Sequence, residues 1–114
     1  MRYLALLVLT LAGVATPALA ADQTGYQAIA GGDLAAAEQQ IASELKIYPH
    51  RPELMLNLAS VYRKTGREQM ARDLYRDVLA RRSVAMDMPS GAVVSSHDLA
   101  KRGLGQTMAV MASR

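Results

Sequence analysis

Four consecutive residues of this chain carry the side chains of a hydrolase triad: Ser95, Ser96, His97 and Asp98. A nucleophilic serine works with histidine and a carboxylate only when the three groups bond in a line. Neighbours on one helix turn point in different directions, which argues against such a line here. Ser95 and Asp98 have instead the spacing of a helix cap, with aspartate in place of the usual glutamate. We therefore expect the run to begin a helix, and we predict no catalytic residue.

Metal ligands and cofactor motifs are equally scarce. The chain has no cysteine and two histidines, His50 and His97, without clustered carboxylates beside them. Protein metal sites gather several such ligands, so no metal site is predicted. Gly31-Gly32 lacks the flanking pattern of a phosphate-binding loop and is interpreted as a helix stop. We therefore predict no metal and no cofactor, and the chemistry of the side chains favours a binding protein over an enzyme.

The N-terminal residues 1–20 have the three parts of a secretory signal peptide. Arg2 gives a basic start, Leu4 to Ala15 is an almost unbroken apolar run, and small residues precede Ala21. The run is shorter than the roughly 20 apolar residues that span a bilayer. We predict cleavage between Ala20 and Ala21, which would leave no membrane span, with retention as an anchor as the alternative. Because a lipoprotein needs a cysteine at the cut, the expected location is periplasmic or secreted.

Length and charge narrow the class of protein further. A chain of 114 residues holds one domain at most. Its formal net charge of +3 falls by one when Arg2 is removed, which is too weak to predict nucleic acid binding. Without cysteine there is no disulfide, so the mature chain must fold by helix packing alone.

Glycine, proline and capping residues divide the first part of the mature chain into helices. A short helix is expected over residues 22–30, and Asp33 suits the N-cap of the next one. Pro49 ends that second helix near Tyr48, because the residue before a proline disfavours helix. Its inward side chains should be Leu34, Ala37, Ile41 and Leu45.

Two further helices are predicted on either side of Gly66. Pro52 suits the first turn of the third helix. Gly66 stands where a left-handed residue commonly ends a helix, and the fourth helix should run from about Arg67 to Arg82. The inward residues are predicted to be Leu54, Leu58, Val61 and Tyr62 on the third helix, and Met70, Ala71, Leu74, Tyr75, Val78 and Leu79 on the fourth.

The two pairs of helices repeat each other along the chain. Four pairs of residues share an offset of 34 positions and the same structural role: Gly32 and Gly66, Ala37 and Ala71, Ile41 and Tyr75, and Leu45 and Leu79. Alanine at a helix crossing lets two backbones approach closely, and a large residue fills the groove beside it. This period is typical of a helix-turn-helix solenoid.

The motif Leu58-Ala59-x-x-Tyr62-x-x-x-Gly66, followed by Ala71-x-x-x-Tyr75-x-x-Val78, resembles the tetratricopeptide repeat. The resemblance covers residues 21–82, as a partial repeat over 22–49 and a full repeat over 52–82. The first copy has Thr24-Gly25 where the second has Leu58-Ala59. The resemblance implies a mainly α fold of antiparallel helical hairpins in an α-solenoid.

In that family the first helices of successive repeats line a concave groove that holds a peptide or an extended segment. The resemblance implies that the partner-binding residues here are Glu53, Leu56, Asn57, Ser60, Arg63 and Lys64. Asn57 stands where the family often has an asparagine that bonds a ligand backbone, and Arg63 with Lys64 suits a carboxylate. The expected function is therefore that of an adaptor or scaffold for a protein or peptide partner.

Residues 83–114 form a separate module outside the resemblance. Val84 to Met88 alternates as a strand does, Pro89-Ser90-Gly91 is a turn signal, and Ala92 to Val94 pairs back as a short β-hairpin. A helix follows, which Gly103 and Gly105 weaken by about 1 kcal/mol each.

The end of the chain, residues 104–114, is expected to be a second short helix or a loose tail. Met108, Val110 and Met111 would form an apolar strip there, suited to capping the repeats or to entering the groove of a partner. Fewer than two complete repeats leave open ends that need a cover. The alternative function is therefore a self-associating structural subunit of an envelope assembly, a homo-oligomer joined through an open repeat edge or this strip.

Overall fold

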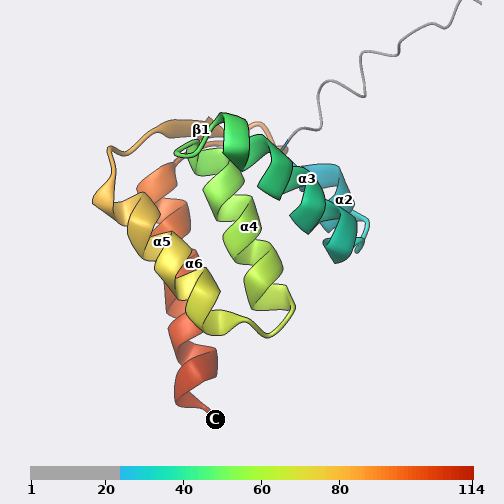
Figure 1. Cartoon of the computed structure of the whole chain (residues 1–114). Helices are drawn as coiled ribbons and strands as arrows, with labels where there is room; N and C mark the ends of the chain where they lie inside the picture. Colours follow the sequence, from blue (N-terminus) through green and yellow to red (C-terminus); the bar gives the residue numbers. More distant parts are fainter. Residues whose placement is uncertain (1–23) are drawn as a thin grey trace, which may run out of the picture.

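The computed structural model describes residues 24–114, which form five helices and one two-stranded antiparallel sheet (Figure 1). The predicted class, mainly α with a short β-hairpin and a C-terminal helix, is confirmed at this level. The predicted signal peptide and its cleavage site, Ala20 and Ala21, lie outside the described residues. Within the described part of the chain, no helix combines the length and apolar character needed to span a membrane.

The first two helices are α2 (Tyr26–Ala30) and α3 (Leu34–Ile47). The carboxylate of Asp33 accepts a hydrogen bond from the Ala36 N–H at 3.1 Å, which confirms the predicted N-cap. Tyr48 is the C-cap, as expected from the proline that follows it. α2 begins later than expected, and it therefore has little more than one turn.

The next two helices are α4 (Pro52–Lys64) and α5 (Glu68–Ala80). Pro52 is the first residue of α4. An N–H at this position has no partner within the helix, so proline costs no helical hydrogen bond there. Thr65 and Gly66 follow α4, and Gly66 has a φ of +77°. This left-handed conformation favours glycine and confirms the predicted turn.

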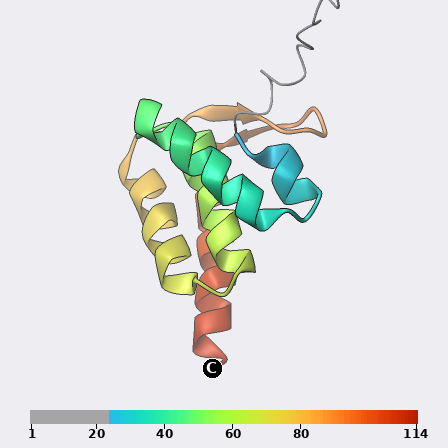
Figure 2. The same cartoon turned by 45° about the vertical axis from the view of Figure 1, so that its right-hand side comes forward.

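The core lies on both sides of α4, which is placed between α3 and α5 (Figures 1 and 2). Toward α3 the buried residues are Ala37, Ile41, Leu54, Leu58 and Val61. Toward α5 and the C-terminal module they are Met55, Leu56, Ala59, Ala71, Tyr75, Val78, Met86 and Ala100. Most predicted inward residues are therefore buried or packed against these clusters.

Met70 is the exception, because 46% of it is exposed. It lies at the border between α5 and the last helix, where it lines a shallow hollow together with Met111. The prediction that Met70 faces the core is wrong. Helical spacing alone places it near the inward stripe of α5, but the neighbouring helix does not cover that position.

The predicted hairpin is present as β1 (Ala85–Asp87) and β2 (Val93–Ser95). The register pairs Ala85 with Ser95, Met86 with Val94 and Asp87 with Val93. Only Met86 of β1 is buried, and it joins the core beneath the hairpin. The hairpin crosses the end of the helical bundle at which α4 begins (Figure 2).

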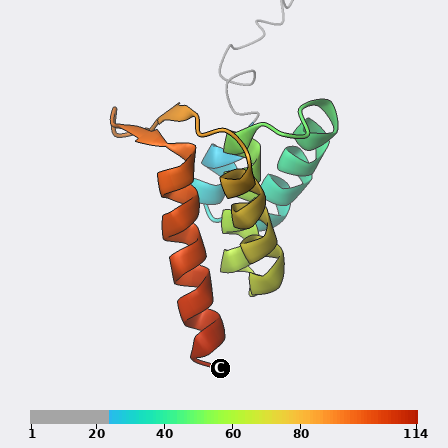
Figure 3. The ribbon, with the colours of Figure 1, turned by 90° about the vertical axis from the view of Figure 1, so that its left-hand side faces the viewer.

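The chain ends in one continuous helix, α6 (Ser96–Ala112), which packs against α5 and α4. The expected break into a second short helix or loose tail over 104–114 is wrong. Gly103 is buried against Tyr75, and a Cβ built on it would lie 2.2 Å from the ring carbon Cζ. The close packing that glycine allows here offsets its low helix propensity. The last turns of α6 extend beyond the N-terminal start of α5 (Figure 3).

An ion pair joins α3 to the turn before α5, and no spacing in the sequence predicts it. Both terminal nitrogens of Arg67 donate to the carboxylate of Glu38, each at 2.7 Å. The Arg67 guanidinium also lies 4.6 Å from the centre of the Tyr62 ring. These hydrogen bonds are the main reason that the pKa of Glu38 lies below its ordinary value.

Candidate binding groove

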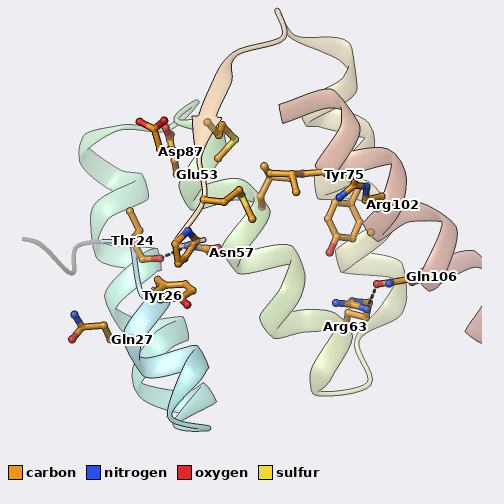
Figure 4. Close-up of a pocket in the computed structure, with 16 residues that line it drawn as sticks. Thr24, Tyr26, Gln27, Glu53, Asn57, Arg63, Tyr75, Asp87, Arg102 and Gln106 are labelled. Carbon is orange, nitrogen blue, oxygen red and sulfur yellow. Dashed lines mark hydrogen bonds between the residues drawn. The ribbon is translucent and has the colours of Figure 1, made fainter. Parts of the chain in front are cut away.

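A groove of about 500 Å³ opens beside α4 and is bounded by the start of the described chain, the hairpin and α6 (Figure 4). Its walls combine apolar, amide and charged side chains. The residues that line it are Thr24, Tyr26, Gln27, Glu53, Leu56, Asn57, Arg63, Tyr75, Met86, Asp87, Met88, Pro89, Leu99, Arg102, Gly103 and Gln106. The groove therefore lies where α4 meets the start of the described chain, the hairpin and α6.

Four of the six predicted partner-binding residues line this groove, namely Glu53, Leu56, Asn57 and Arg63. Residues three, four or seven positions apart share one face of a helix, which explains why they come together. Ser60 and Lys64 do not line the groove. Lys64 is exposed in the last turn of α4, so the structure does not bring it together with Arg63 at the groove as a carboxylate site.

Asn57 bonds a peptide backbone, but the backbone belongs to its own chain. Its side-chain amide donates to the carbonyl oxygen of Thr24 at 2.8 Å. This bond holds the first described residue against the middle of α4 (Figure 4). The amide oxygen of Asn57 remains an acceptor for a further group in the groove.

Arg63 connects α4 to α6. Its guanidinium donates through Nη1 to the amide oxygen of Gln106, while its Nε is buried without a hydrogen-bond partner among residues 24–114. Arg63 also interacts with the Tyr75 hydroxyl. Burial raises the pKa of Tyr75, and Arg63 counteracts part of that rise. Arg63 thus contributes positive charge to the groove and positions the helix that forms its far wall.

The charges of the groove are separated along its length. Figure 4 shows Glu53 and Asp87 toward one end, and Arg63 and Arg102 toward the other. Within residues 24–114, Arg102 has no carboxylate within 4.0 Å, whereas Glu53 pairs with Arg51 at 3.5 Å. Leu56, Met86 and Leu99 supply apolar surface to the lining. Such a groove suits an extended chain that carries both apolar and charged side chains.

Sequence reasoning missed the wall that the C-terminal module provides. Leu99, Arg102 and Gln106 come from α6, and Met86 to Pro89 come from β1 and the turn that follows it. The spacing of these residues is that of an ordinary helix and hairpin. The small number of repeats favours a cap from this module over the second helix pair, but nothing in the spacing places these residues at the groove. Only the packing of α6 on α5 and α4 does so.

Among the described residues, the side chains whose types match a hydrolase triad do not bond to one another. Instead, Ser95, Ser96 and His97 each bond to a different backbone group. Ser95 Oγ accepts from the Asp98 N–H at 3.0 Å, which confirms the predicted cap. Ser96 Oγ accepts from the Val84 N–H at 2.9 Å. His97 Nε2 lies 2.6 Å from the carbonyl oxygen of Arg81. The contacts of Ser96 and His97 join the start of α6 to the chain that leaves α5.

Comparison with protein-family models, with curated proteins and with solved structures finds no match to this chain. The tetratricopeptide resemblance therefore remains a prediction that depends on the spacing of the residues quoted above.

Proposed function

We propose that this chain is a protein-interaction module of the bacterial periplasm or the secreted space, and that it binds an extended segment of another protein. The observation that carries the proposal is the groove beside α4. Four residues expected to bind a partner line it together with Arg102, a cation without a carboxylate partner among residues 24–114. A groove with apolar surface and separated charges selects a partner by shape and by charge.

The same proposal includes a tetratricopeptide-like arrangement of the helices. Helices α2 and α3 form one pair, and α4 and α5 form a second pair with the larger interface. The offset of 34 positions between equivalent residues of these pairs supports a repeat. In this arrangement α6 is the cap that covers the open side of the second pair, because it packs on both α5 and α4.

The location rests on the sequence of residues 1–20. A basic start, an apolar run and a small-residue cleavage site support export by a signal peptide. N-terminal sequencing of the chain recovered from the cell envelope would test it, with Ala21 as the expected first residue.

A pair of charge reversals on neighbouring residues of α6 tests the binding function. Arg102 lines the groove, whereas Lys101 is exposed and does not. Tagged full-length chains carrying Arg102→Glu or Lys101→Glu would be crosslinked in the native envelope and the bound proteins quantified. We expect Arg102→Glu to reduce capture of the specific partner by about tenfold, because like charges in an interface repel, and Lys101→Glu to leave it unchanged. Equal capture by both variants would contradict a role for the groove.

A second candidate function, self-association in an envelope assembly, is favoured by the exposed apolar residues near the end of α6. Met70, Met108 and Val110 are exposed by 46%, 41% and 40%. Light scattering across a range of concentrations would detect a dimer. Met108→Asp should abolish it, whereas Val93→Asp, at a hairpin residue exposed by 65%, should not. A monomer at every concentration would eliminate this candidate.

A further inference from the structure

The hydrogen-bond register of the hairpin determines which backbone groups of β1 remain free. Antiparallel pairs alternate between those that exchange hydrogen bonds and those that do not. Ser96 N–H donates to the Val84 carbonyl at 2.7 Å, and Met88 N–H donates to the Ala92 carbonyl at 2.8 Å. Residues 84 and 88 therefore bond toward β2, and so does Met86 between them. The N–H and C=O groups of Ala85 and Asp87 point away from β2.

This free edge borders the groove. Successive side chains of a strand point to opposite faces of the sheet. Met86 points into the core and Asp87 is exposed, yet both line the groove, and no residue of β2 does. A cavity lined by residues from both faces of β1, and by none of its partner strand, lies along the outer edge of β1. No backbone bond to Asp87 from elsewhere in residues 24–114 is present.

We propose that the partner segment binds as an added β-strand, pairing through its backbone with the edge of β1 at Asp87. The inference rests on the proposed function, because it concerns the way a segment occupies the same groove. Asp87 supplies one N–H donor and one C=O acceptor, and a strand in the groove satisfies both. Pro89 has no N–H to donate, so the pairing ends at the turn.

The charges near this edge define the chemistry of the segment. Glu53 and Asp87 stand at the β1 end of the groove, and Asp87 has no cation within 4.0 Å among the described residues (Figure 4). Leu56 and Met86 add apolar surface to the same lining. The occupant is therefore an extended segment with an apolar side chain toward Leu56 and Met86 and a basic side chain beside Asp87.

Proline substitutions at two paired residues test the backbone contact. Asp87 and Val93 face each other in a pair that exchanges no hydrogen bonds, so proline at either position removes an N–H that the hairpin does not use. Only the N–H of Asp87 lies at the groove. Random dodecapeptides displayed on phage would be selected on the full chain, and the selected peptides measured against Asp87→Pro, Val93→Pro and Asp87→Asn.

We expect Asp87→Pro to weaken binding of the selected peptides about two- to tenfold relative to Asp87→Asn, the effect of one backbone hydrogen bond. Val93→Pro should bind as the unchanged chain does. Basic peptides should also bind Asp87→Asn less tightly than the unchanged chain. Equal binding to Asp87→Pro and Asp87→Asn would overturn strand addition while leaving a peptide-binding groove intact. A selection that yields no peptide would overturn the proposed peptide-binding function as well.

Hydrogen exchange on the unchanged chain gives a test that needs no variant to fold. Bound peptide should slow exchange of the Asp87 amide at least tenfold, because a new hydrogen bond protects it. The Val93 amide, on the other edge of the hairpin, should exchange at its original rate. Protection of neither amide, or of both equally, would contradict pairing at the edge of β1.

Discussion

Replacement of Gly103 by alanine sets helix propensity against packing at a single position of α6. Alanine in a helix interior is favoured over glycine by about 1 kcal/mol. At Gly103, however, the added Cβ would lie 2.2, 2.5 and 2.6 Å from Cζ, Cε1 and Oη of Tyr75. Ordinary carbon contacts are roughly 3.5–4.0 Å, so the ring must move by more than 1 Å. Tyr75 is 4% exposed and has little room to do so.

Gly105 provides the matched control, because it lies in the same helix and its added Cβ would meet nothing within 4 Å. Overpacking a core costs about 1–3 kcal/mol, so the propensity gain leaves Gly103→Ala with a net loss of about 0–2 kcal/mol. Gly105→Ala should gain about 1 kcal/mol in the free energy of unfolding. The expected difference between the two variants is therefore about 1–3 kcal/mol.

Urea unfolding of the purified chain measures both changes, provided that the dependence on urea is the same in each variant. In a Tyr75→Leu background, the penalty at Gly103 should shrink, since the ring that meets the new methyl group is gone. If Gly103→Ala stabilises the chain as much as Gly105→Ala, then the close contact between α6 and Tyr75 is not present and the reasoning fails.

Three further predictions concern single side chains outside α6. Because hydrogen bonds from Arg67 lower the pKa of Glu38 below its ordinary 4.5, the stabilisation from this carboxylate is complete above that value and declines as the pH falls through the folded pKa. The difference in unfolding free energy between the unchanged chain and Glu38→Gln should thus disappear in acid, and a difference independent of pH would contradict the pairing. Asp33→Ala should cost about 1 kcal/mol of stability by urea unfolding, because the Ala36 N–H loses its cap. Asn57→Ala should speed hydrogen exchange in α2 without changing that in α6, because it releases the Thr24 carbonyl; equal acceleration in both helices would indicate general destabilisation instead.

Expectations drawn from the sequence are accurate where the interaction joins residues close together along the chain, and they fail where it depends on a distant element. Asp33, Pro52, Gly66 and Ser95 mark helix ends because each acts on backbone groups within a few residues. The hairpin was predictable for the same reason, from alternation and a turn signal. Met70 was misplaced because its exposure depends on where α6 lies, and periodicity along α5 carries no information about that.

Only the α4 side of the candidate groove, four of the sixteen lining residues, could be predicted from the sequence. The resemblance to a repeat indicated Glu53, Leu56, Asn57 and Arg63, because one helix face is readable from spacing. The opposite wall, with Arg102 and Gln106, depends on the path of a module that has no repeat period of its own.

By itself, the sequence determined the succession of helices, their caps, the short hairpin and the offset that relates the two helix pairs, since these depend on local backbone chemistry. Only the tertiary structure decided that α6 continues through Gly103, because a buried contact with Tyr75 outweighs the helix propensity of one residue. It also decided that Glu38 meets Arg67, and that the edge of β1 borders the groove beside α4. Those contacts join residues far apart along the chain, and the packing of whole elements brings them together.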